Sequence, residues 1–79
     1  MWIRSQNRMQ LQDVNRFVIE RFETGIYIVG NGCTLGIYST KEKALKVLDD
    51  INSLLDATEF DVSNLPIVFE MPLDEEVEL

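Results

Sequence analysis

An Asn-Gly pair at residues 31 and 32, set between two apolar runs, constrains this fold more than any other feature of the sequence. Asn-Gly is the preferred pair for a two-residue type I′ hairpin turn, because both residues tolerate positive φ. In that register Tyr27 lies opposite Gly36, where a ring covers a bare glycine. The other face is then predicted to be apolar, with Ile28 paired with Leu35, Ile26 paired with Ile37, and Cys33 at its end.

Residues 17–22 precede this hairpin and predict a further strand, because they are rich in aromatic and β-branched residues. A two-residue loop at Glu23-Thr24 or Thr24-Gly25 would place Phe17 and Ile19 on the same face as Ile26 and Ile28. A three-residue loop would reverse that orientation. Residues 2–5 and 11–14 are shorter strand candidates.

A helix is expected over about residues 40–55. Ser39 and Glu42 have the spacing of a capping box, in which the serine side chain accepts from the Glu42 N–H and Glu42 reaches back. Residues 56–65 are interpreted as a loop. Residues 67–71 lie between two prolines, which favours an edge strand. The helix has one apolar stripe, made of Ala44, Val47, Leu48, Ile51, Leu54 and Leu55.

Together these elements predict an α+β fold: a small antiparallel meander of about 4–5 strands with one amphipathic helix on one face and a late edge strand. Residues 1–73 would form a single domain, and residues 74–79, with four acids, an acidic and mobile tail. The second face of the sheet is not cleanly polar, and Trp2, Phe60 or another chain could cover it. Its apolar side chains are predicted to be Val18, Phe22, Tyr27, Val29 and Tyr38.

Charge is unevenly distributed along the chain, whose formal net charge is −7. Residues 1–46 hold seven basic and four acidic residues, whereas residues 47–79 hold ten acidic and no basic residues. Direct binding of nucleic acid or an anionic membrane by the acidic half is disfavoured, since like charges repel. The sequence has no apolar signal-peptide region, and the uncharged window 24–40 contains four glycines, so a soluble cytoplasmic protein is expected.

The sequence contains no histidine and one cysteine, which argues against imidazole catalysis and against a Cys/His zinc site within one chain. Cys33 could be a nucleophile or redox sensor, but it lacks a histidine partner and is interpreted as a buried, inert thiol. The turn at residues 30–32 could be mistaken for a phosphate loop, yet it precedes a strand and has no P-loop lysine. We therefore predict no cofactor.

Paired acids could serve as an acid–base pair or as metal ligands. Asp49 and Asp50 are adjacent on a helix and diverge, and residues 56–61 lack the glycine of an EF-hand loop. Glu59 and Asp61 are likewise interpreted as solvated acids. Four arginines that could form a basic patch are interpreted as ordinary surface: Arg4, Arg8, Arg16 and Arg21. The alternative is that Arg4 and Arg8 contact an acidic partner, such as the C-terminal half of a second copy.

Three segments, taken in order, resemble a family of short uncharacterised proteins from Firmicutes and their phages. They are Ile3-Arg4-Ser5-Gln6, residues 35–51 beginning Leu35-Gly36-Ile37-Tyr38-Ser39-Thr40, and Phe69-Glu70-Met71-Pro72. The resemblance implies a bacterial or phage setting and carries no catalytic motif. The long segment 56–65 departs from the family pattern.

We therefore expect a non-enzymatic interaction or accessory protein that binds itself as a homodimer, or binds a host or phage protein. The alternative is an acidic inhibitor that mimics nucleic acid and occupies a basic groove. Because its acidic side chains would be exposed, salt would screen this binding strongly. A carboxylate-dependent enzyme would need convergent acids, and the sequence shows none. The expected contact residues are the second-face set named above together with Asp74, Glu75, Glu76 and Glu78.

Overall fold

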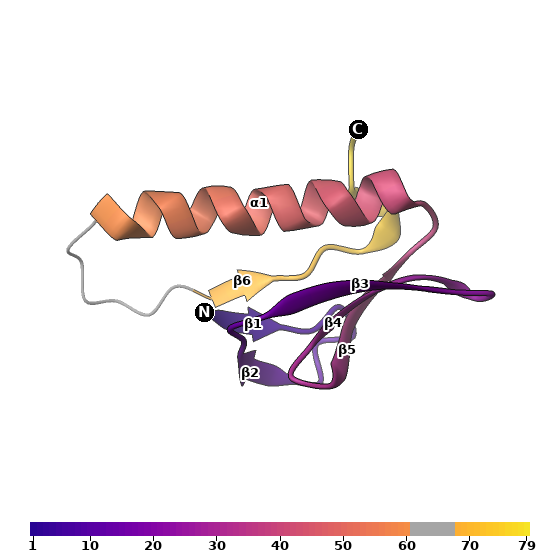
Figure 1. The fold of residues 1–79 in the computed structure, drawn as a ribbon, viewed down its shortest axis with the longest axis horizontal. Helices are drawn as coiled ribbons and strands as arrows, with labels where there is room; N and C mark the ends of the chain where they lie inside the picture. Colours follow the sequence, from indigo (N-terminus) through magenta and orange to yellow (C-terminus); the bar gives the residue numbers. More distant parts are fainter. Residues whose placement is uncertain (61–67) are drawn as a thin grey trace.

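The computed structural model describes residues 1–60 and 68–79, and Figure 1 shows one long helix lying above the strands. The elements follow the order β1 (Trp2–Arg4), β2 (Leu11–Asp13), β3 (Phe17–Phe22), β4 (Gly25–Gly30), β5 (Cys33–Tyr38), α1 (Lys41–Phe60), β6 (Val68–Glu70) and the 3-10 turn η1 (Asp74–Glu76). The expected α+β class, with one helix packed on a sheet, is confirmed.

The strands divide between two small sheets rather than forming one meander. One sheet has the order β2-β1-β6 and the other has the order β3-β4-β5. The β6 strand pairs with β1 in parallel, and α1 lies in the crossover that such a parallel pair requires. The late strand therefore lies at a sheet edge, as its flanking prolines predicted, while Ile67 lies outside the described residues.

Both hairpins of the β3-β4-β5 sheet have two-residue loops. Phe22 pairs with Gly25 around Glu23-Thr24, so β3 places Phe17 and Ile19 on the buried side as expected. Asn31 and Gly32 have φ values of 53° and 77°, which both central positions of a type I′ turn require.

The register of β5 differs from the expected one by a bulge. The ladder shifts between Ile28 and Val29, so Ile28 pairs with Gly36 and Ile26 with Tyr38. Because a one-residue slip exchanges the two faces, Ile37 turns outward and Tyr38 turns into the core. The Tyr38 ring covers Gly36, where an added Cβ would lie 2.9 Å from ring atoms. The predicted pairing of Tyr27 with Gly36 is therefore wrong.

Helix α1 begins at Lys41 and runs to Phe60, five residues beyond the predicted end. The interpretation of residues 56–60 as loop is therefore wrong, and residues 61–65 lie outside the described residues. Thr40, not Ser39, caps the helix: its Oγ1 accepts the Lys43 N–H at 3.2 Å. The predicted apolar stripe packs inward through Ala44, Val47 and Ile51, while Leu55 is exposed.

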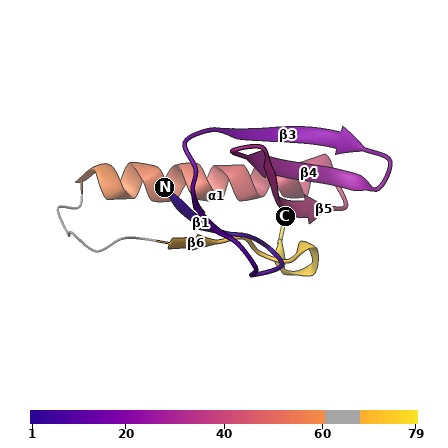
Figure 2. The same cartoon turned by 90° about the horizontal axis from the view of Figure 1, so that it is seen from below.

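The C-terminal segment closes the core on the side opposite β3. Figure 2 shows β6 alongside β1, on the side of the molecule away from β3. Met71 is buried and Val77 packs against the core. Residues 74–79 are therefore not a separate tail, because Asp74 and Val77 contact the folded body.

Candidate interaction surface

The β3-β4-β5 sheet has an apolar surface on the side that faces away from the helix. Strand alternation and the observed pairing place its side chains together, since Val18 pairs with Val29 and Tyr27 with Ile37. Three of these side chains are substantially exposed, Val18 by 38%, Phe22 by 49% and Ile37 by 41%. We call this surface the outer face, and it consists of Val18, Phe22, Tyr27, Val29 and Ile37.

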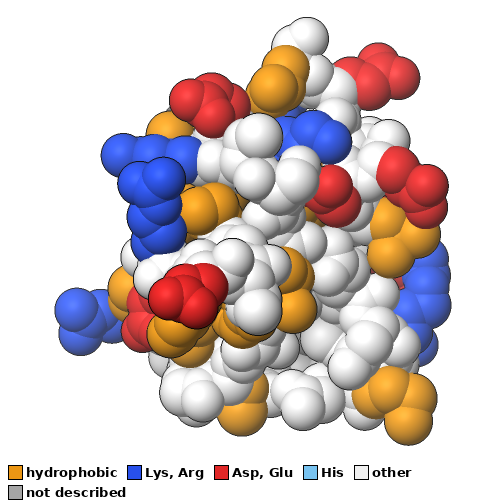
Figure 3. All heavy atoms as spheres, turned by 90° about the vertical axis from the view of Figure 1, so that its right-hand side faces the viewer, with side chains coloured by type: hydrophobic (Ala, Val, Ile, Leu, Met, Phe, Trp, Pro, Cys, Tyr) orange, Lys and Arg blue, Asp and Glu red, His pale blue; other side chains and the backbone are white. Residues whose placement is uncertain are grey.

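Aromatic packing orders the hairpin end of the outer face. The Phe22 and Tyr27 ring centroids lie 4.7 Å apart with a 59° tilt, a geometry typical of favourable ring pairs. The Thr24 and Tyr27 hydroxyls share a hydrogen bond of 2.6 Å. Figure 3 views this end of the molecule, where hydrophobic side chains lie beside acidic and basic groups. The outer face is therefore mostly apolar, with the exposed Glu20 lying between Val18 and Phe22 opposite Tyr27.

Tyr38 is the one predicted second-face residue that the structure places elsewhere. Its side chain is only 1% exposed, and its hydroxyl donates to the Pro72 carbonyl at 2.7 Å. Burial raises the pKa of the Tyr38 hydroxyl well above its usual range, with the charges of Asp74 and Glu76 adding to the effect. Ile37 takes its place on the outer face, an exchange that simple strand alternation does not predict.

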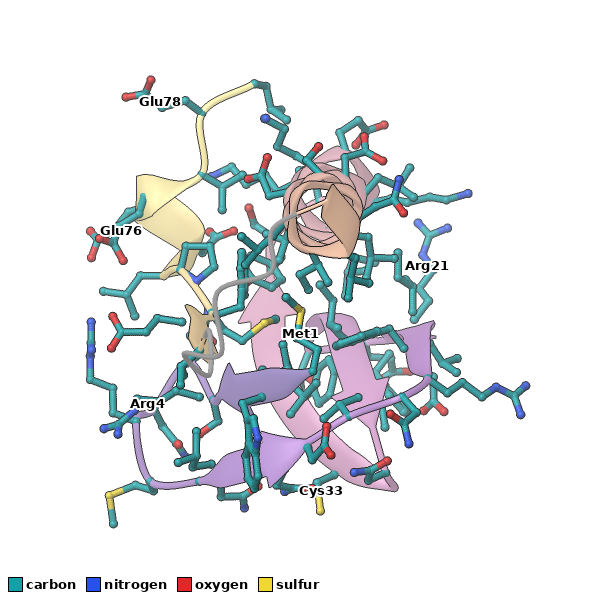
Figure 4. All side chains as sticks on the ribbon, turned by 90° about the vertical axis from the view of Figure 1, so that its left-hand side faces the viewer. Met1, Arg4, Arg21, Cys33, Glu76 and Glu78 are labelled. Carbon is teal, nitrogen blue, oxygen red and sulfur yellow. The ribbon has the colours of Figure 1, made fainter. Side chains whose placement is uncertain are left out.

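The acidic C-terminal residues have two different roles. Asp74 accepts hydrogen bonds from the Ser39 backbone N–H at 2.8 Å and the Ser39 hydroxyl at 3.1 Å, and lies 3.7 Å from the Lys43 ammonium. The Ser39 N–H is the main reason why the pKa of Asp74 is lowered. Glu75 and Glu78 are exposed, and Figure 4 shows Glu76 and Glu78 on the same side of the molecule. The predicted acidic set therefore shares one region, but Asp74 is bonded within the chain.

The arginines do not converge on one patch. Figure 4 shows Arg4 and Arg21 on opposite sides of the molecule. Arg8 lies 3.4 Å from Glu70, between side chains that are both exposed. Cys33 is half-buried at the start of β5, and Figure 4 shows it at the sheet end away from α1.

Candidate catalytic and metal-binding groups are dispersed. Asp49 and Asp50 are exposed on α1, where Asp50 pairs with Lys46 at 2.9 Å. Within residues 1–60 and 68–79, no three His, Cys, Asp or Glu side chains lie close enough to hold a metal ion. Glu59 lies in the last turn of α1, and Asp61 lies outside the described residues. Residues 30–32 form the β4-β5 turn.

A cavity of about 580 Å³ lies between β3 and the start of α1, lined by Ile19, Arg21, Ile26 and residues 39–42. Although it adjoins a helix N-terminus, Thr40 already caps that end within the chain. None of the helices in the described part of the chain is long and apolar enough to cross a membrane.

Comparison with known proteins gives no relative: no family model, curated protein or solved structure matches this chain.

Proposed function

We propose that this chain is a non-enzymatic interaction module that associates with itself through its β3-β4-β5 sheet. The observation that carries the proposal is the β3 side of the outer face, where Val18 is 38% and Phe22 49% exposed beside Tyr27. Apolar surface gathered into one patch is typical of a contact region, whereas scattered apolar residues are not.

The size of the chain supports the same proposal. A single core in a domain of 79 residues rarely contributes more than about 3–5 kcal/mol of net stability. Burying apolar area contributes roughly 25 cal/mol per Å², so covering the exposed Val18 and Phe22 side chains would add to that small total. A bacterial or phage setting, implied by the family resemblance, remains a prediction.

Sedimentation velocity over a range from about 10 µM to about 500 µM tests the proposal, because association follows mass action. We expect the weight-average sedimentation coefficient to rise with concentration. Polar substitution of two outer-face residues, Val18→Ser with Phe22→Ser, is expected to remove that rise. Leu45→Ser is the matched control, since Leu45 is 42% exposed but lies on α1. A strict monomer at every concentration would contradict self-association.

A further inference from the structure

The two edges of the β3-β4-β5 sheet differ in what covers them. The β5 edge is closed by Gln6, whose side-chain Oε1 accepts the Ile37 N–H at 3.0 Å and whose Nε2 donates to the Ile37 carbonyl at 3.1 Å. The Gln6 backbone N–H also donates to the Leu35 carbonyl at 2.7 Å. Gln6 therefore occupies the hydrogen-bonding positions that an added strand would use.

The β3 edge has no such cover. Phe22 and Gly25 close a two-residue hairpin, so they form a hydrogen-bonded pair. Because hydrogen-bonded pairs alternate along an antiparallel ladder, the backbone groups of Val18 and Glu20 also bond to β4. The N–H and C=O groups of Phe17, Ile19 and Arg21 consequently point away from the sheet. No hydrogen bond to these outward groups is found from residues 1–60 or 68–79. Figure 2 shows β3 as the outermost strand along its border of the molecule.

The β3 strand carries apolar side chains on both of its faces. Val18 and Phe22 belong to the outer face, while Phe17 and Ile19 are only half-buried on the inner face. The inner pair is incompletely covered because α1 packs against β4 and β5, which leaves the 580 Å³ cavity beside Ile19. A strand with apolar residues on both faces is typical of the interior of a sheet.

Natural proteins usually protect an edge strand by a bulge, a proline or very short length. The β3 strand has six residues, contains no proline and pairs with β4 without a register shift. It does carry Glu20 and Arg21, which discourage pairing with an arbitrary strand. These charges favour a partner that presents complementary charges at fixed positions.

We infer that β3 pairs antiparallel with β3 of a second copy of this chain, centred on Ile19, so that two three-stranded sheets become one. This inference rests on the proposed self-association and identifies its surface. In this register the outward groups of residues 17, 19 and 21 bond to the same groups of the second copy. Because the pairing has a two-fold axis at Ile19, the outward backbone groups of both copies are hydrogen-bonded in the same way.

Charge complementarity favours the second copy over an unrelated peptide. Arg16 precedes β3 and, like Glu20, is exposed and has no ion pair among the described residues. The side chains of Arg16 and Glu20 point to the same side of the sheet as Val18 and Phe22, because alternate residues of a strand share a face. Antiparallel pairing centred on Ile19 places Arg16 of each copy diagonal to Glu20 of the other, within reach of long side chains, while the two Glu20 side chains are diagonal to each other across the axis. Two attractive contacts therefore stand against one repulsive contact.

Hydrogen exchange of the unmodified protein tests the inference directly. Ile19 and Arg21 amides point outward in a single copy, whereas the Glu20 amide is already bonded to β4. On raising the concentration from about 20 µM to about 500 µM, we expect Ile19 and Arg21 amides to exchange more slowly by up to about fivefold, the limit that mass action sets for a monomer–dimer equilibrium over this range, with Glu20 changing less. Unchanged exchange at Ile19 and Arg21, in a protein that sediments as a dimer, would overturn the inference.

Substitutions at the edge give a second test. Arg21→Pro removes an outward N–H without breaking the β3-β4 ladder, and prolines are tolerated at such edge positions. We expect Arg21→Pro to abolish association and Arg21→Ala to retain it. Arg16→Glu and Glu20→Arg should each weaken association, and the double variant should restore it. If Arg21→Pro fails to fold, the charge reversals and the hydrogen exchange decide.

Measuring association of the Ile37→Ser variant distinguishes pairing at the β3 edge from packing through the outer face. Ile37 is an outer-face residue on β5, away from the β3 edge. Loss of association in Ile37→Ser with retention in Arg21→Pro would overturn edge pairing while leaving self-association intact. A wild-type monomer would overturn both. Retention in Ile37→Ser with loss in Arg21→Pro is the result we expect.

Discussion

At the scale of single residues, the exchange of Ile37 and Tyr38 determines what the molecule presents to its surroundings. The bulge puts an aliphatic side chain on the outer face and a tyrosine in the core. The buried hydroxyl is satisfied by the Pro72 carbonyl, which also accepts from the Gln6 side chain at 3.1 Å. Tyr38 therefore links β5 to the chain segment that follows β6.

Tyr38→Phe tests this link. The variant removes the hydroxyl but keeps the ring, and the Pro72 carbonyl retains its bond from Gln6. We expect a loss of about 1 kcal/mol in the free energy of unfolding, the usual value for one buried hydrogen bond. Tyr27→Phe is the matched control, since its hydroxyl bond to Thr24 is exposed, and we expect a change within about 0.5 kcal/mol. Urea unfolding measures both, and equal losses would contradict the assignment.

At the scale of elements, local spacing predicted the hairpins and the helix because their determinants are local. Asn31-Gly32 and the run 17–22 specify turn and strand with no help from distant residues. The bulge in β5 could not be predicted in this way, because it depends on Tyr38 meeting Gly36 and Pro72 in three dimensions. The outer face was therefore predicted correctly on β3 and β4 and incorrectly on β5.

The helix start illustrates the same limit. Ser39 and Thr40 both have capping side chains, and the Ser39–Glu42 spacing fits a capping box. Asp74, 35 residues away, instead accepts from Ser39, and Thr40 caps the helix. Sequence spacing alone did not distinguish the two, because the choice is made by a contact between distant segments.

Thr40→Ala and Ser39→Ala separate these roles. We expect Thr40→Ala to lower the free energy of unfolding by about 1 kcal/mol through loss of the N-cap. Ser39→Ala should cost less, within about 0.5 kcal/mol, because its backbone N–H still donates to Asp74. Thermal unfolding followed by circular dichroism measures both variants. A larger loss in Ser39→Ala than in Thr40→Ala would favour the capping box.

At the scale of the whole molecule, the acidic C-terminal segment holds separate elements together. Asp74 joins the residue before the helix cap to Lys43 in the first turn of α1, and Lys43 also donates to the Asp74 carbonyl at 2.9 Å. Glu76 accepts the Leu73 N–H at 2.8 Å, which shapes the turn that carries Asp74. Part of the excess negative charge is thus structural, and the remaining exposed acids keep the net charge far from zero.

Asp74 should therefore make the stability of the molecule depend on pH in the acidic range. Its pKa is lowered from 3.8 in the folded chain, chiefly by the Ser39 N–H, so the unfolded chain binds the proton more readily. The stabilisation is fully present above the unfolded pKa and is lost as the pH falls through the lower, folded pKa. Asp74→Asn removes this titration, and Glu75→Gln, at an exposed acid, is the control. Thermal unfolding between about pH 5 and pH 2 should show a steeper fall in melting temperature for the wild type and for Glu75→Gln than for Asp74→Asn. Parallel curves for all three would mean that the Asp74 carboxylate does not hold the C-terminal segment to the helix.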